Sequence, residues 1–241
     1  MMNLAVFDID GTLLNNLMVE DQCFASALGV VLRLREFDTD WASYEHVSDI
    51  GIAVEAYRRE FGRDPSTAEL DAASAHFVAQ LRTAQRDTGA LVPMLGASAL
   101  LEALTADGWA VALATGAWRR AAEYKLEASG LPVAQYPLAT SEDGPARVDI
   151  IRHACAQARE RAGVGAFART VSVGDGVWDV RAARTLGLPF VGVARDAQVR
   201  RLRTEGADRV VSDFTNLADA FEALVTARIP HQAASRPPAS A

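Results

Sequence analysis

The sequence predicts an α/β fold: a Rossmann-like parallel sheet covered by helices on both faces, with an inserted all-helical domain. Three observations support this prediction. Residues 3–7 (NLAVF) form a short apolar run that ends at an aspartate, as in a buried parallel strand. Residues 18–88 carry helical patterns and few β-branched runs. Beyond residue 90, strand and helix patterns alternate, which is the order that builds a parallel sheet.

These patterns divide the 241 residues into three parts. An α/β core takes residues 1–15 and 90–228, and the helical insert takes residues 16–89. Residues 229–241 (IPHQAASRPPASA) are rich in Pro, Ala and Ser, which predicts a disordered tail. Half of all residues are apolar, so the rest of the chain has enough apolar side chains for a core.

The insert contains three helical stretches, at residues 20–32, 51–62 and 67–89. In the last, apolar residues recur at helical spacing: Leu70, Ala73, Phe77, Val78 and Leu81. Ser66 or Thr67 is placed to cap this helix, with Glu69 near the capping-box position. Ser48 or Asp49 is placed to cap a helix that begins at Ile50.

The core continues as an alternation of strands and helices. Apolar runs predict strands over 109–114, 133–138, 170–173, 190–193 and 209–211. Helical spacing and glycine stops predict helices over 97–106, 117–129, 147–161, 178–186 and 217–226. In the third of these helices, Ile150, Ile151, Ala154, Cys155 and Ala158 share one face.

Charge and composition exclude several classes of function. The net charge of −7 and a pI near 5.1 argue against nucleic acid or an anionic membrane surface as a partner. No apolar run approaches the roughly 18 residues of a membrane span, and no signal segment opens the chain. Cys23 and Cys155 have no CxxC spacing and are expected to be reduced thiols. We expect a cytoplasmic protein, whose oligomeric state these patterns leave open.

Polar residues follow three predicted strands at the point where each strand ends. Asp8 and Asp10 follow the first strand, Thr115 the second, and Asp175 the strand over 170–173. Ligands of open parallel sheets bind beyond the carboxyl ends of the strands, so these residues are expected to meet there.

The three segments "DIDGT", "LATG" and "VGDGVWD" resemble, in this order, motifs of the haloacid dehalogenase superfamily, whose members are mostly phosphatases. The helical insert sits where that superfamily places its C1-type cap, and the chain is similar to the phosphoglycolate phosphatase-like members. The resemblance implies a Mg²⁺ cofactor and a small phosphorylated metabolite as substrate.

Physical chemistry also indicates a metal. The carboxylates of Asp8, Asp10, Asp175 and Asp179 in one cleft would raise one another's pKa unless a cation intervenes. Hard oxygen ligands suit Mg²⁺, which also accepts an oxygen of a phosphate. The resemblance implies that Asp10 uses its backbone carbonyl as a ligand. It also implies that Asp175 ligates directly, while Asp179 acts through water or orients Asp175.

The resemblance assigns catalysis to the first two aspartates. Asp8 is the nucleophile that forms an aspartyl-phosphate, and Asp10 is the general acid and base. Haloacid dehalogenases proper lack an acid at the second position, so Asp10 favours phosphoryl chemistry. Thr12, Thr115 and Gly116 are expected to bind the substrate, the last two through a hydroxyl and amides near a helix N-terminus.

The third motif departs from the family, which places a lysine at the start of the helix that precedes the 170–173 strand. Only Arg147 fits there, within "SEDGPARVDII", and a guanidinium can hold phosphate in two-point contact. Lys125 is the only lysine and lies in another helix, where we expect a solvated surface residue. Trp118 and Trp178 flank the strand-end loops and either frame the pocket or pack in the core.

The sequence therefore predicts a Mg²⁺-dependent phosphatase that acts on a small phosphomonoester. A phosphomutase of the β-phosphoglucomutase type and a phosphate-binding regulatory relative with little activity remain as alternatives. Phosphonate hydrolysis is excluded, because it needs a lysine in the insert and residues 16–89 contain none. The chain also differs from a receiver-type signalling domain, which is much shorter and lacks a helical insert after its first strand.

Overall fold

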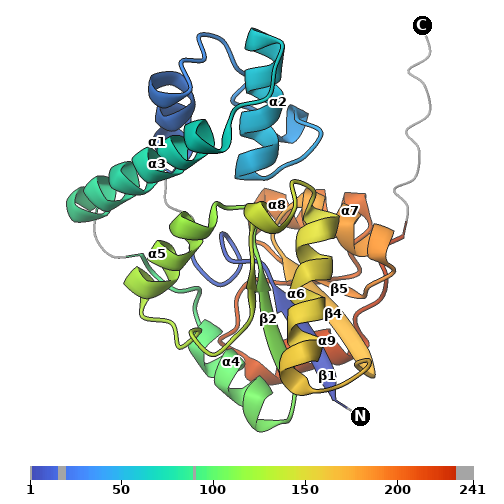
Figure 1. The fold of residues 1–241 in the computed structure, drawn as a ribbon. Helices are drawn as coiled ribbons and strands as arrows, with labels where there is room; N and C mark the ends of the chain where they lie inside the picture. The colour runs from blue at the N-terminus through green and yellow to red at the C-terminus, as the bar shows by residue number, and fades with distance from the viewer. Residues whose placement is uncertain (1, 16–19, 89–90, 232–241) are drawn as a thin grey trace, which may run out of the picture.

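The computed structural model describes residues 2–15, 20–88 and 91–231, and they form a six-stranded parallel sheet with helices around it (Figure 1). The strand order is β3-β2-β1-β4-β5-β6, and every pairing is parallel. The predicted α/β fold is thereby confirmed. The strands are β1 (Asn3–Phe7), β2 (Ala110–Ala114), β3 (Leu138–Ala139), β4 (Arg169–Gly174), β5 (Phe190–Val193) and β6 (Arg209–Val211).

The register brings the ends of the central strands to the same level. Phe7 of β1 pairs with Leu113 of β2 on one side and with Val173 of β4 on the other. The residues that follow these strands therefore lie along one edge of the sheet. This edge holds the polar residues that the sequence places after each strand.

Each face of the sheet is covered by its own set of helices, because alternate residues of a strand point to opposite faces. Phe7 packs with α4 (Ala97–Ala106), α5 (Arg119–Ser129) and α9 (Leu217–Thr226). Leu4 and Val6 pack on the opposite face with α6 (Arg147–Ala162) and with Ala182 of α7 (Val177–Leu186). Both faces of β1 are thus excluded from water, as its continuous apolar sequence predicts.

Residues 20–88, between β1 and β2, form a helical segment with a hydrophobic core. It contains α1 (Glu20–Ser26), the π-helical turn η1 (Ala27–Val31), the 3₁₀ turn η2 (Trp41–Ser43), α2 (Asp49–Phe61) and α3 (Thr67–Thr88). Figure 1 shows this segment at the end of the sheet towards which the strands run. Trp118, at the start of α5, enters the core of the segment and packs against Phe24 and Phe77.

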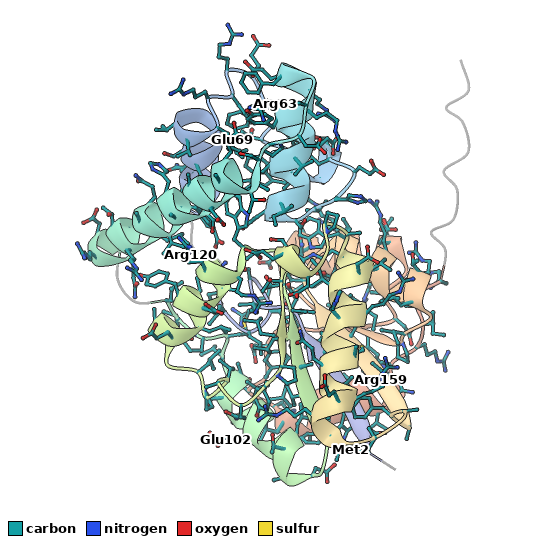
Figure 2. The ribbon with its side chains drawn as sticks, viewed as in Figure 1. Met2, Arg63, Glu69, Glu102, Arg120 and Arg159 are labelled. Carbon is teal, nitrogen blue, oxygen red and sulfur yellow. The ribbon has the colours of Figure 1, made fainter. Side chains whose placement is uncertain are left out.

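Local signals set the helix ends within this segment. Ser48 caps α2 by accepting a hydrogen bond from the Gly51 N–H. Ser66 and Glu69 form the predicted capping box at the start of α3. Arg63 then pairs with Glu69 across the turn from α2 to α3, at the end of the segment that Figure 2 shows farthest from the sheet.

The structure also corrects several predicted elements. The strand predicted over 133–138 is β3, only Leu138–Ala139, and α5 begins at Arg119 rather than at residue 117. Helix α8 (Asp196–Glu205) was not predicted, because "DAQVRRLRTE" offers Leu202 as its only buried residue. Of the predicted tail, residues 229–231 are described and Pro230 is buried, while residues 232–241 lie outside the described residues. None of the described helices is long and apolar enough to cross a membrane.

Candidate active site

Three carboxylates converge where β1 and β4 end. Asp8 follows β1, Asp175 follows β4, and Asp179 lies in the first turn of α7. One carboxylate oxygen from each lies within 4.8 Å of the others. Asp179 also accepts a hydrogen bond from the Gly176 N–H at 3.0 Å, which holds the loop that carries Asp175. The cluster therefore depends on the parallel register of two neighbouring strands.

Gly11 allows this close approach. Its φ of +74° lies in the left-handed region, and a Cβ built on it would lie 2.1 Å from the Oδ2 atom of Asp175. Any other residue here would push the Asp175 carboxylate away from the end of β1. The glycine of "DIDGT" is thus required by the site as well as by the turn.

Arg147, at the start of α6, is the cation of this cluster. Its Nη1 donates to the Oδ1 atom of Asp8 at 2.9 Å, and its Nε lies 3.6 Å from the Oδ1 atom of Asp179. A Cβ on Gly116 would lie 3.1 Å from the guanidinium carbon. The loop after β2 is therefore close to the same side chain, and Gly116 leaves the space that Arg147 occupies.

Asp8 and Asp179 are buried and Asp175 is half-buried, and this environment raises the pKa values of all three carboxyls. Burial, followed by the charges of Asp179 and Asp10, raises the pKa of Asp8 to about 7, although Arg147 opposes the shift. Burial also raises the pKa of Asp175 and of Asp179. Three ionised carboxylates and one guanidinium would leave a net charge of −2 at this point.

Lys125 forms a second buried charge network beside the first. It is 0% exposed, and its Nζ donates to the Oδ2 atom of Asp10 and to the Oε1 atom of Glu20, each at 2.6 Å. Burial alone would lower the pKa of Lys125, but the charges of the two carboxylates outweigh it and raise that pKa. Lys125 of α5 thereby links the β1 loop to the first helix of the helical segment.

A cavity of about 350 Å³ lies between the sheet edge and the helical segment. The sheet side contributes Asp10, Thr115, Gly116, Arg147 and Asp175 to its lining. The helical segment contributes residues of α1, of the turn η2 and of the start of α2. The predicted site residues Asp10, Thr115, Gly116, Arg147 and Asp175 thus share one cavity.

Hydrogen bonds tie the start of α2 to the sheet side. Ser48 Oγ donates to the Pro145 carbonyl at 2.6 Å, and the Asp49 N–H donates to the Gly116 carbonyl at 2.8 Å. The Trp118 N–H donates in turn to the Oδ2 atom of Asp49 at 2.8 Å. The helical segment therefore lies directly over the loop after β2.

Sequence comparison assigns the family. The family model of haloacid dehalogenase-like hydrolases matches residues 2–187, which include the three strand-end loops and the whole helical segment. The chain belongs to the haloacid dehalogenase-like hydrolases. No curated protein matches this hydrolase in sequence.

Solved structures share its fold. A hydrolase from Pseudomonas syringae is 21% identical, with a TM-score of 0.67, over 92% of this chain and 98% of that one. CbbY from Rhodobacter sphaeroides in complex with phosphate is 22% identical, with a TM-score of 0.65, over 90% and 96%. A predicted phosphoglycolate phosphatase from Haemophilus somnus is 19% identical, with a TM-score of 0.60, over 91% and 98%.

The acidic cluster of this hydrolase fits a divalent metal. Carboxylate oxygens of Asp8, Asp175 and Asp179 are hard donors of the kind that Mg²⁺ binds, and they lie close enough to share one ion. The net charge of −2 that remains beside Arg147 is also what a divalent cation neutralises. The side chain of Asp10 lies outside the cluster and pairs with Lys125, which leaves its backbone carbonyl as the expected ligand.

One expectation from the sequence needs correction: Lys125 is buried and doubly paired rather than a solvated surface residue. Thr12 is fully buried, and its hydroxyl has no hydrogen-bond partner among the described residues. Like Asp8 and Asp179 it is absent from the cavity lining, so its contact with substrate stays a prediction. The two tryptophans also differ: Trp118 packs in the core of the helical segment, whereas Trp178 lines the cavity.

A signal for Lys125 was present in the sequence. The buried residues of α5 are Ala121, Ala122, Lys125 and Leu126, so the lysine occupies an apolar-face position at helical spacing. A lysine at such a position requires a buried carboxylate partner. The sequence could not say which one, because Asp10 and Glu20 lie 115 and 105 residues away along the chain.

Proposed function

We propose that this hydrolase is a Mg²⁺-dependent phosphatase that cleaves a small phosphorylated metabolite through an aspartyl-phosphate on Asp8. One observation carries the proposal. The Asp8 carboxylate lies at a strand end, in contact with Arg147 and within reach of a metal held by Asp175 and Asp179. Asp10, two residues along, has its side chain turned to a different partner and is free of the cluster.

The metal site would use the carboxylates of Asp8 and Asp175 and the backbone carbonyl of Asp10. Asp179 would orient the loop of Asp175 through its hydrogen bond to the Gly176 N–H. When bound, Mg²⁺ neutralises the negative charge of the phosphoryl oxygens and lets the anionic ester approach an acidic site. Arg147 adds a cation at the same point, and its guanidinium can hold phosphate oxygens in two-point contact.

The reaction would have two steps, and Asp8 and Asp10 take part in both. A carboxylate oxygen of Asp8 forms a bond to phosphorus while the ester P–O bond breaks, and Asp10 donates its proton to the departing alkoxide. Asp10 then takes a proton from water, whose oxygen attacks phosphorus and releases phosphate and the free carboxylate of Asp8. Lys125 would hold Asp10 in place between these two proton transfers.

The helical segment would act as the cap of this enzyme. It covers the cavity and is hydrogen-bonded to the loop that carries Thr115 and Gly116. A cap in this position excludes bulk water from the phosphoryl group and contacts the leaving group. Thr115 and Gly116 would contact phosphate oxygens at the sheet edge.

Phosphate release from a panel of phosphorylated metabolites tests the proposal. We expect turnover in Mg²⁺, loss of turnover in EDTA, and no turnover by Asp8→Asn. The matched control is Asp107→Asn, because Asp107 is exposed and its side chain has no bond to any described residue. Isomerisation of a sugar phosphate without release of phosphate would instead identify a phosphomutase. Phosphate binding without turnover of any ester would identify a regulatory relative.

A further inference from the structure

The wall that the helical segment contributes to the cavity is acidic and aromatic. Glu20 and Asp21 of α1 and Asp49 of α2 line it, together with the rings of Phe24 and Trp41. This wall faces a substrate whose phosphoryl group lies at the sheet edge, so it is where the leaving group would bind. Its chemistry therefore limits the kind of leaving group that the enzyme accepts.

No free cation lies along this cavity among the residues that the structure describes. Arg147 is the one positively charged side chain among the described residues that line it, and it is already engaged by Asp8 and Asp179. Lys125 lies behind Asp10 and Glu20 and is 0% exposed, so it cannot contact a bound molecule. A carboxylate or a second phosphate on the leaving group would thus meet carboxylates without a compensating partner.

The same carboxylates still have acceptor capacity. Asp49 accepts the Trp118 N–H through Oδ2, Glu20 accepts Lys125 through Oε1, and Asp21 accepts the Trp41 indole N–H through Oδ1. The second oxygen of each accepts no hydrogen bond from the described residues. Burial raises the pKa of both Glu20 and Asp49 to about 7, although Lys125 opposes the shift at each.

We propose that the leaving group of the substrate presents hydrogen-bond donors, either hydroxyl or ammonium, and carries no carboxylate or second phosphate. This inference rests on the proposed phosphatase function and names its substrate class. Hydroxyl and ammonium groups share the donor chemistry that the acidic wall requires. The aromatic faces of Phe24 and Trp41 can contact the carbon atoms between those donors.

Three esters of nearly equal size test the inference at pH 8, where Glu20 and Asp49 are mainly ionised. They are 2-aminoethyl phosphate, 2-hydroxyethyl phosphate and phosphoglycolate, which differ in bearing an ammonium, a hydroxyl or a carboxylate. Glycerol 3-phosphate and 3-phosphoglycerate form a second, longer pair. Phosphate release gives kcat/KM, and inhibition of p-nitrophenyl phosphate turnover ranks the affinity of an ester even where its own turnover is slow.

We expect the esters without a carboxylate to exceed their carboxylate counterparts by at least about tenfold, in kcat/KM or in affinity. The ratio of kcat/KM for 2-aminoethyl phosphate to that for 2-hydroxyethyl phosphate shows whether the site prefers an ammonium or a hydroxyl donor. The Asp21→Asn and Asp49→Asn substitutions should reduce the difference in kcat/KM or affinity between the esters without a carboxylate and those with one. Each substitution keeps an amide acceptor and removes a negative charge. Asp21 is exposed, so its variant tests the inference even where Asp49→Asn impairs folding. Asp71→Asn, on the exposed face of α3, is the matched control and should leave the gap unchanged.

The outcomes separate this inference from the proposed function. Absence of p-nitrophenyl phosphate turnover in Mg²⁺ would overturn the phosphatase proposal and the inference with it. Turnover of p-nitrophenyl phosphate together with equal or better use of the carboxylate esters would overturn the inference alone. A preference that neither aspartate variant alters would also overturn it, because the acidic wall would then not be its cause.

Discussion

The substitution Asp8→Asn should have opposite effects on turnover and on stability. Turnover should be lost, because an amide is not a nucleophile towards phosphorus. Metal-free protein should become more stable at alkaline pH, because Asp8 is 5% exposed and lies in a cluster with Asp175 and Asp179. Asparagine keeps the shape of the side chain and cannot ionise there.

The sign and size of the stability change follow from the pKa of Asp8, raised from 3.8 to about 7, chiefly by burial. The folded state keeps the proton of Asp8 at pH values where the unfolded chain has lost it. The stability that protonated Asp8 gives to the folded state is fully present below about pH 4 and is lost as the pH rises through about 7. At about 1.4 kcal/mol for each pH unit, the cost of ionised Asp8 at pH 8 is at most about 4 kcal/mol. Asp8→Asn removes that cost at pH 8, whereas at pH 5 it removes only about 1.6 kcal/mol, because pH 5 lies little more than one unit above the ordinary pKa of 3.8.

Urea unfolding followed by tryptophan fluorescence measures the effect, with EDTA present, at pH 5 and pH 8. The change in unfolding free energy on Asp8→Asn should be more favourable at pH 8 than at pH 5 by between about 1 and 2.7 kcal/mol, because only the two pH units from 5 to 7 separate the two conditions. Asp107→Asn should show no such difference. Added Mg²⁺ should stabilise the wild type at pH 8, by about 2.7 kcal/mol at one hundred times its Kd, and the variant less.

An equal loss of stability at both pH values would refute this reasoning. It would mean that Asp8 is held mainly by its contact with Arg147 and that the cluster is not short of positive charge. A wild type that Mg²⁺ does not stabilise at pH 8 would refute the metal site directly.

Three further predictions concern steady-state kinetics. Arg147→Ala should lower kcat/KM far more than Lys125→Ala, and the reverse order would mean that the support Lys125 gives to Asp10 matters more than the cation beside Asp8. Asp10→Asn should lower kcat by about 10²–10⁴ for alkyl phosphates and by less for p-nitrophenyl phosphate, whose leaving group needs no proton; an equal loss for both esters would argue against the acid role. Gly116→Ala should raise KM severalfold, since its Cβ would lie 3.1 Å from both the Arg147 guanidinium and the Val47 carbonyl; unchanged kinetics would place the phosphate elsewhere.

Much of the candidate site at the sheet edge could be predicted from the sequence, because its geometry follows from strand order and register. Asp8, Thr115 and Asp175 each come directly after a strand, and neighbouring parallel strands end at one edge. Arg147 was predicted from the family resemblance instead, as the cation at the start of the helix before β4. The helical segment was found because its apolar residues have helical spacing and because it lies between β1 and β2.

The sequence by itself determined the α/β fold, the helical insertion after β1 and the residues at the strand ends, since each depends on a local pattern. Only the tertiary structure decided the environments of those residues. It turned Lys125 inward to Asp10 and Glu20, buried Thr12, and lined the helical-segment side of the cavity with carboxylates. The physical reason is that the rotation of a helix and its packing against distant segments depend on the whole core. The charge balance in a cavity depends in turn on which side chains that packing brings together.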